Sequence, residues 1–273
     1  MDYSINFHQT FAPEKEAIAQ LVQFASINNE YFSKEEISAM TAIPTGDRSG
    51  KVVPHILYSE AMGLISVSKE ESNYSLTLTP LGEVVNSEDP FLMEDITQWL
   101  CHYNLARIGS PAALWSYIFN SIIYSNGMEF TNQSLVNALT RKFDTNKINV
   151  TPFRTCYTAE KCFRDLNILD ITEEKYYFKQ HNIDRAYRYF YAYILLNSWE
   201  RTLLNQSEIT YENLLSDIGF GGPFLWDEKS IMEVLEIFHE ERLIFINRQL
   251  SPITLIKQVS SDLMLSKMYS FLL

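Results

Sequence analysis

The chain has little of what marks a disordered, secreted or membrane-spanning protein. Among its 273 residues are only nine Gly and nine Pro, without a biased tract, which argues against disorder and long linkers. Three cysteines, an odd number, do not suggest a disulfide framework. No apolar run approaches the roughly 18 residues that span a bilayer. The stretch Met1-Asp2-Tyr3-Ser4 also lacks the features of a signal peptide. We therefore expect a cytoplasmic protein without membrane contact.

Positive charge is also scarce, since 22 Lys and Arg stand against 34 Asp and Glu, for a net charge of −12. Such a balance argues against non-specific DNA binding. The charge is unevenly distributed, however. Residues 1–90 carry 5 basic and 13 acidic side chains (−8), residues 91–182 carry 9 of each (zero), and residues 183–273 carry 8 and 12 (−4). Only the middle third can present a basic face without strong repulsion from its neighbours.

One pattern occurs three times along the chain. An apolar residue is followed by Ser or Thr, three residues, then Ile or Leu, as in Phe32-Ser33…Ile37, Phe130-Thr131…Leu135 and Ile209-Thr210…Leu214. The hydroxyl can cap a short helix, and the later Ile or Leu starts its buried face. About thirty residues on, each copy reaches an apolar doublet that follows a longer helical stretch and precedes a strand–turn–strand pattern; the doublets are Leu64-Ile65, Ile168-Leu169 and Leu243-Ile244. This order is typical of a winged helix-turn-helix, whose second helix usually reads nucleic acid.

The copies start 98 and 79 residues apart, which is too irregular for a solenoid. We therefore predict a mainly α fold with small β-hairpins (α+β), built from tandem winged helix-turn-helix modules packed around a helical centre. The predicted parts are module 1 over residues 1–88, a helical connector over 89–128, module 2 over 129–182, and a helical segment with module 3 over 183–273. The connector is strongly apolar, so we expect it to lie at the centre of the core.

The strongest candidate for a nucleic-acid contact is the predicted second helix of module 2, Thr151–Leu166, which a Thr-Pro pair starts. Its apolar residues recur at helical spacing; they are Pro152, Cys156, Ala159, Phe163 and Leu166. The opposite face carries Arg154, Tyr157, Thr158, Lys161 and Arg164, with Arg141, Lys142 and Lys147 just upstream. Long cations beside hydroxyls suit phosphate contacts and base-edge hydrogen bonds. The same polar residues are equally consistent with an ordinary solvent-exposed helix face that has no binding role.

A second candidate is Gly46-Asp47-Arg48-Ser49-Gly50-Lys51, which only superficially suggests a phosphate-binding P-loop. Its glycines are one residue too close, Val52 replaces the metal-binding hydroxyl, and no strand precedes it. A helix N-terminus with Arg48, Ser49 and Lys51 can still hold one DNA phosphate. A simple turn is the alternative.

Nothing in the sequence predicts a catalytic or metal site. Cys156 and Cys162 are six residues apart without a second Cys/His pair, and we expect Cys101 and Cys156 to be small buried side chains. The five histidines show neither metal spacing nor a triad signature. We therefore expect no cofactor, no metal and no enzymatic activity.

Module 3 is expected to fold as a winged helix that binds no DNA. Its predicted second helix, about Asp227–Arg242, carries six acidic residues against two basic ones, which would repel a phosphate backbone. A core stripe remains at helical spacing, made by Ile231, Val234, Leu235 and Phe238. We expect this module to pack on its neighbours or on a protein partner.

Several segments resemble the bacterial family catalogued as domain of unknown function 4007. They are Phe7-His8-Gln9-Thr10-Phe11, Pro44-Thr45-Gly46, Ser49-Gly50-Lys51-Val52, Met62-Gly63-Leu64-Ile65, Leu78-Thr79-Pro80-Leu81-Gly82, Asp89-Pro90-Phe91-Leu92 and Ala113-Leu114-Trp115. The resemblance covers about residues 7–170, and Gln9 stands where many members have Glu. It implies a component of bacterial genome-defence loci, often beside sulfate-reductase-like proteins of DNA phosphorothioation systems. It supplies no catalytic residues.

We therefore predict a non-enzymatic, DNA-binding winged-helix protein of a DNA-modification or anti-phage system. Its expected partners are double-stranded DNA and other defence proteins. The alternative is an adaptor that assembles other defence subunits. The net charge favours the adaptor, as does the aromatic stretch Tyr187–Tyr193 if its rings are exposed.

Overall fold

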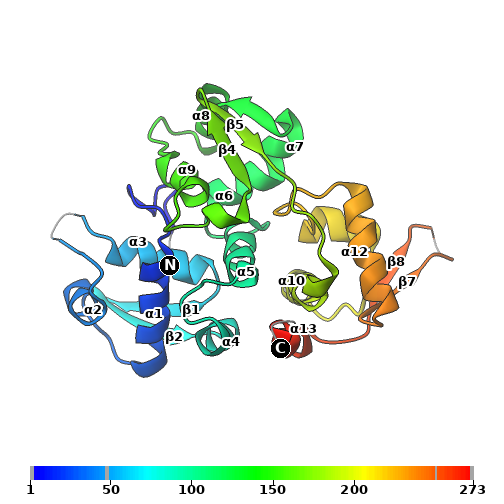
Figure 1. Cartoon of the computed structure of the whole chain (residues 1–273), viewed down its shortest axis with the longest axis horizontal. Helices are drawn as coiled ribbons and strands as arrows, with labels where there is room; N and C mark the ends of the chain where they lie inside the picture. The colour runs from blue at the N-terminus through cyan, green and yellow to red at the C-terminus, as the bar shows by residue number, and fades with distance from the viewer. Residues whose placement is uncertain (1–2, 47–48, 250, 271–273) are drawn as a thin grey trace. The chain divides into compact units, whose positions relative to one another are not determined.

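The computed structural model describes residues 3–46, 49–249 and 251–270, and shows a mainly helical α+β chain with small antiparallel sheets, as predicted (Figure 1). The chain divides into two compact units, unit 1 (Met1–Lys179) and unit 2 (Gln180–Leu273). Within the described ranges, every helix is too short or too polar to span a membrane.

Unit 1 begins with three helices and a hairpin. These elements are α1 (Lys15–Ile27), α2 (Lys34–Thr41), α3 (Val52–Ala61), β1 (Ile65–Glu70) and β2 (Asn73–Leu78). The strands pair antiparallel from Ile65 opposite Leu78, and an isolated bridge joins Phe32 to Tyr74 of β2. The predicted capping box is confirmed, because the Ser33 hydroxyl accepts from the Glu36 N–H and the Glu36 carboxylate accepts from the Ser33 N–H.

The rest of unit 1 repeats this plan after two connecting helices. Those helices are α4 (Pro80–Glu88) and α5 (Asp95–Ala106). A helix with a π-helical middle follows, made of α6 (Ala113–Tyr117), η1 (Ile118–Ile122) and α7 (Ile123–Asn126). Then come β3 (Glu129–Thr131), α8 (Asn132–Phe143), α9 (Thr151–Thr158), the 3-10 turn η2 (Arg164–Leu166), β4 (Leu169–Thr172) and β5 (Lys175–Phe178). The sheet has the order β3-β5-β4.

Unit 2 follows the plan once more. Its elements are η3 (Arg185–Tyr187), α10 (Arg188–Thr202), β6 (Glu208–Thr210), α11 (Tyr211–Asn213), the π-helical η4 (Leu214–Ile218), α12 (Glu228–Glu240), β7 (Ile244–Asn247), β8 (Thr254–Lys257) and α13 (Ser261–Lys267). The strand order β6-β8-β7 matches that of the preceding sheet.

The order helix, strand, helix, helix, hairpin therefore occurs three times among the described residues, with the first strand reduced to a single bridge in the first copy. In each copy the hydroxyl that the sequence pattern singles out caps the second helix, by accepting from the N–H three positions later; these residues are Ser33, Thr131 and Thr210. We call the copies repeat 1, repeat 2 and repeat 3.

The core of unit 1 lies around α5, which is buried on almost all sides. The Trp115 ring of α6 contacts rings from three other segments, namely Phe7 of the N-terminal stretch, Tyr58 of α3 and Phe153 of α9. Large aromatic rings bury much apolar area, so this cluster joins repeats 1 and 2 into one core. The apolar stretch predicted as a connector is thus part of the core of unit 1.

Candidate nucleic-acid interface

The helix predicted over Thr151–Leu166 begins where expected, but α9 ends at Thr158. Ala159 is extended, and the Phe163 N–H then bonds to the Cys156 carbonyl to close a turn. The physical reason is burial. Cys162 and Phe163, which lie in this turn, are both buried. The turn brings both side chains into the core.

The accessible face of α9 consists of one arginine and three threonines. Thr151 and Thr158 are exposed, and Arg154 and Thr155 are partly exposed. Positions three and four apart share one face of a helix, so these four residues form a single stripe. No described carboxylate lies within ion-pair distance of Arg154. The stripe therefore offers a free cation between hydroxyl groups.

Tyr157 does not belong to this face, and its predicted exposure is wrong. Its ring is buried, and its hydroxyl lies 2.8 Å from Nδ1 of His102 on α5. Burial raises the pKa of the Tyr157 phenol well above its ordinary value. The inner face of α9 is made by Pro152, Phe153, Cys156 and Tyr157, so the predicted burial of Pro152 and Cys156 is confirmed and the buried face is wider than predicted.

Two further predicted contacts, Lys51 and Lys161, are held by one carboxylate. The Lys51 ammonium lies 2.8 and 2.9 Å from the two oxygens of Glu14, and the Lys161 ammonium lies 2.9 Å from one of them. Burial raises the pKa of Glu14, but the hydrogen bonds and charges of the two lysines together bring it below its ordinary value. Both cations thus join the starts of α1 and α3 to the turn after α9, and are not free for phosphate.

The other residues predicted to contact nucleic acid differ in exposure and in ion pairing. Arg164 pairs with Glu160 at 2.9 Å across exposed side chains. Ser49 is exposed, whereas Arg48 lies outside the described residues. Lys147 is exposed in the loop between α8 and α9. Arg154 and Lys147 form no ion pair with any residue that the structure describes.

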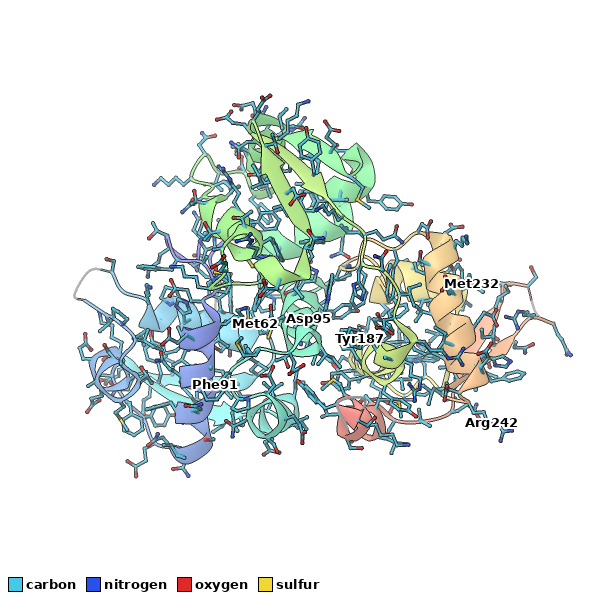
Figure 2. All side chains as sticks on the ribbon, in the orientation of Figure 1. Met62, Phe91, Asp95, Tyr187, Met232 and Arg242 are labelled. Atoms are coloured by element: carbon cyan, nitrogen blue, oxygen red, sulfur yellow. The ribbon has the colours of Figure 1, made fainter. Side chains whose placement is uncertain are left out.

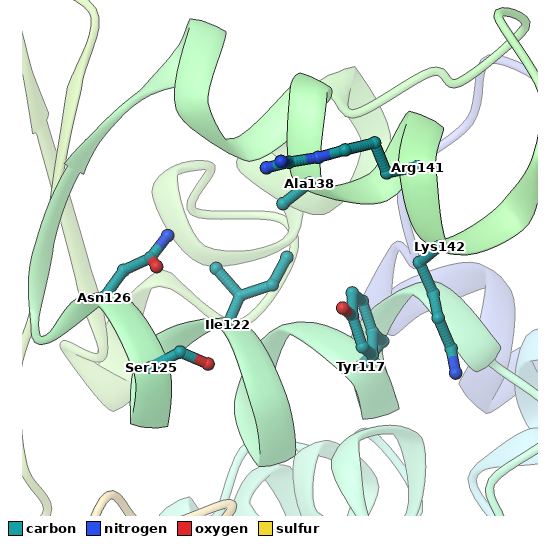
Figure 3. Close-up of a pocket in the computed structure, with 7 residues that line it drawn as sticks. All are labelled: Tyr117, Ile122, Ser125, Asn126, Ala138, Arg141 and Lys142. Atoms are coloured by element: carbon teal, nitrogen blue, oxygen red, sulfur yellow. The ribbon is translucent and has the colours of Figure 1, made fainter.

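Arg141 and Lys142, at the end of α8, border a pocket of about 340 Å³ against the α6–η1–α7 helix (Figure 3). The other lining residues are Tyr117, Ile122, Ser125, Asn126 and Ala138. The Lys142 ammonium lies 5.3 Å from the centre of the Tyr117 ring, within cation–π range. Nε of Arg141 donates to the Asn137 carbonyl at 3.3 Å.

The helices equivalent to α9 in the other repeats cannot present such a face. In repeat 1, α3 is buried on nearly every side. In repeat 3, the predicted core stripe of α12 is confirmed as buried, and the accessible side carries Glu228, Glu233 and Glu240. Among these three helices, α9 is the one that contains no acidic residue.

The hairpins of repeats 1 and 2 are acidic at their tips. Glu70 and Glu71 are exposed at the turn between β1 and β2, and Glu173 and Glu174 at the turn between β4 and β5. Glu173 and Glu174 adopt left-handed backbone angles, with φ of 50° and 63°. Carboxylates at both tips disfavour contact with phosphate.

The cysteines lie in the interior, as expected for Cys101 and Cys156. All three are free and buried, and burial raises the pKa of the Cys156 thiol. Within the described ranges, no three His, Cys, Asp or Glu side chains are grouped in a way that could hold a metal ion.

The fold is similar to that of two solved structures, described as "Magnesium ion-bound SspB crystal structure" and "SspB crystal structure", with TM-scores of 0.73 and 0.72. Each shares 18% sequence identity with this chain over 97% of this chain and 86% of the other. A comparison with curated proteins finds no match. Residues 6–269 match the family described as "Protein of unknown function (DUF4007)", so the resemblance extends through the last hundred residues as well. The chain belongs to the DUF4007 family.

Proposed function

We propose that this protein binds double-stranded DNA through repeat 2, and that it serves without enzymatic activity in a cytoplasmic DNA-modification or anti-phage system. The observation that carries the proposal is the accessible stripe of α9, where Arg154 lies between threonines without an ion-pair partner among the described residues, and Lys147 is exposed in the preceding loop. We interpret the three repeats as winged-helix modules. The defence setting, of the phosphorothioation type, and protein partners from the same system rest on the family resemblance.

The chemistry of the stripe suits a major groove. A groove about 12 Å wide admits a helix, and an arginine there can donate two hydrogen bonds to guanine. Threonine can bond to base edges with its hydroxyl and contact thymine with its methyl group. Lys147 would lie toward a phosphate, where a cation fixes position without reading sequence.

The test compares two single-charge variants by fluorescence anisotropy on a labelled duplex across a salt series. Arg154→Ala should weaken binding about tenfold, because a good base contact is worth about 1–3 kcal/mol. Lys161→Ala removes the same charge from a lysine already paired with Glu14, so it is the matched control and should change affinity little. Equal losses in the two variants would refute this interface. A wild-type protein without salt-dependent affinity would refute DNA binding itself.

Absence of cleavage is a separate part of the proposal. One of the similar structures is described as magnesium-bound, which is a statement about that protein. Supercoiled plasmid incubated with this protein and Mg²⁺ should stay supercoiled. Nicking that scales with protein concentration and disappears with EDTA would overturn the non-enzymatic assignment while leaving the interface intact.

A specific observation favours the adaptor as the second candidate. Phe91 (labelled in Figure 2) and Met93 are 64% and 66% exposed, on either side of the buried Leu92. The turn is fixed, since the Asp89 carboxylate accepts from the Met93 and Glu94 N–H groups and Leu92 adopts a left-handed φ of 55°. A strained turn that presents two large apolar side chains is typical of a protein contact.

The aromatic stretch of the adaptor hypothesis, in contrast, lies mostly in the core of unit 2. Phe190, Tyr191 and Tyr193 are buried, and only Tyr187 and Tyr189 are partly exposed. A pull-down from the native host, with and without nuclease, separates the two functions. Nuclease-resistant partners that are lost with Phe91→Ser/Met93→Ser, while duplex affinity stays unchanged, would support the adaptor.

A further inference from the structure

The pocket between the α6–η1–α7 helix and α8 has an unusual charge for this protein. The chain holds 34 acidic residues, yet the seven lining residues include two cations and no carboxylate. Neither Arg141 nor Lys142 forms an ion pair with any residue that the structure describes. A concave site with uncompensated positive charge attracts an anion.

The polar groups around the pocket are mostly donors. Arg141 extends across the pocket above Ala138, and Lys142 runs beside Tyr117, so the two cations border different sides (Figure 3). Nε of Arg141 already bonds within α8, which leaves the terminal nitrogens of the guanidinium for a ligand. The Asn126 amide can add a further donor. This set suits an oxyanion with several acceptor atoms.

The opposite wall owes its side-chain arrangement to the π-helical segment η1, Ile118–Ile122. A π turn contains an extra residue, and each residue turns an α-helix by about 100°. The later residues are therefore rotated, and Ser125 and Asn126 line the pocket while Tyr124 is almost fully exposed. Such π segments occur frequently at functional sites. The segment supports a binding role for this wall independently of the charges.

We propose that this pocket binds a phosphate monoester together with its sugar, either the 5′-phosphate at the end of a DNA strand or a free nucleotide. A monoester carries about −1.5 to −2 charges at pH 7, which two cations match. A phosphate within a duplex carries one charge and has a sugar on each side, so it suits a groove better than a pocket. The site is separate from the α9 stripe on which the proposed function rests, because none of its lining residues belongs to α9.

The test uses deoxyadenosine 5′-monophosphate as the probe and deoxyadenosine as its uncharged counterpart, with the full chain in a calorimeter. The monophosphate should bind and the nucleoside should not. Arg141→Ala and Lys142→Ala should each weaken binding about tenfold or more, since each removes a hydrogen bond to a charged group. Lys175→Ala is the matched control, because it removes one charge from an exposed pair with Glu129 in the same repeat. It should leave the affinity unchanged.

Two further readouts separate binding from general charge or folding effects. Affinity should rise between pH 5 and 7.5, because the phosphate loses its second proton near pH 6 while Arg and Lys stay charged. Arg141→Lys keeps the charge and should lose less affinity than Arg141→Ala, with circular dichroism spectra identical to wild type. No binding of the monophosphate at millimolar concentration, or equal loss in Lys175→Ala, would overturn the proposal.

A comparison of two DNA strands of the same sequence, one with a 5′-phosphate and one without, identifies the source of the phosphate. Tighter binding of the phosphorylated strand assigns the pocket to strand ends, and equal binding assigns it to free nucleotides. The variant Arg154→Ala keeps this site distinct from the duplex interface, since it should weaken duplex binding without affecting the monophosphate. If the protein binds the duplex but not the monophosphate, only the pocket proposal is rejected and the proposed duplex interface stands.

Discussion

Replacing Glu14 by Gln tests how repeats 1 and 2 are held together. The Glu14 side chain is 17% exposed and accepts from Lys51 and Lys161, while its backbone N–H donates to Nε2 of His55 at 3.1 Å. Glutamine has nearly the same shape and leaves the backbone bond in place. The substitution therefore removes the charge on the carboxylate and little else.

The magnitude follows from the exposure of the two partners. The Lys161 side chain is 60% exposed, and an exposed ion pair is worth about 0.2–1 kcal/mol. The Lys51 side chain is 28% exposed and contacts both carboxylate oxygens, and hydrogen bonds to charged groups are worth about 1.5–3 kcal/mol. We expect Glu14→Gln to lower the free energy of unfolding by about 2 kcal/mol at pH 7, mostly through Lys51.

The assay is urea unfolding of the full chain, followed by circular dichroism at pH 7 and pH 3.5. Folding depresses the pKa of Glu14, so its stabilisation is present above the ordinary carboxyl pKa and is lost as the pH falls through the folded value. The difference between wild type and Glu14→Gln should therefore narrow at pH 3.5. Double-mutant cycles with Lys51→Met and Lys161→Met should give the larger coupling for Lys51. An equal difference at both pH values, or a larger coupling for Lys161, would refute this reasoning.

Two other predictions concern stability. Gly82→Ala would place its Cβ 1.9 Å from the backbone oxygen of Leu64, so it should lower the free energy of unfolding by about 2 kcal/mol or more in thermal melts. The control is Glu83→Ala at the exposed neighbouring position. If Gly82→Ala changes the stability as little as this control does, the predicted clash is contradicted. Burial lowers the pKa of His8 and of His181 to about 4. Below pH 6.5 the unfolded chain takes up these protons first, so stability should fall between pH 6.5 and 4 by about 1.4 kcal/mol per pH unit for each histidine. Urea midpoints that do not change between pH 7 and 5 would count against this.

The sequence predicted those features that depend on neighbouring residues. A hydroxyl that caps a helix acts within three positions, so Ser33, Thr131 and Thr210 could be found without knowledge of the rest of the chain. The three-residue strands β3 and β6 were not predicted, because such short segments carry no detectable alternation. Their position depends on pairing with the hairpin that follows.

The candidate site was predicted less completely, because the pairing of its cations and the end of α9 depend on contacts between residues far apart in the sequence. Glu14 is 37 residues from Lys51 and 147 residues from Lys161, and no local pattern indicates that they meet. The end of α9 likewise depends on the turn that buries Cys162 and Phe163. Charge and helical spacing could locate a basic region, but tertiary contacts decide which of its cations stay free.

The acidic tip of the β4–β5 hairpin has a consequence for how a duplex can be oriented. Two-residue hairpin turns with positive φ at both positions favour Asn and Gly, yet this turn has Glu173 and Glu174 there. The left-handed angles cost about 1–2 kcal/mol for each residue, but they close the hairpin, and the Glu174 carbonyl accepts from the Asn132 N–H at 2.8 Å. The two exposed carboxylates would also repel a duplex that tilts toward the hairpin. If repeat 2 binds DNA as proposed, this repulsion would favour approach from the side of α8 and α9 and would restrict the docking angle before any base is contacted.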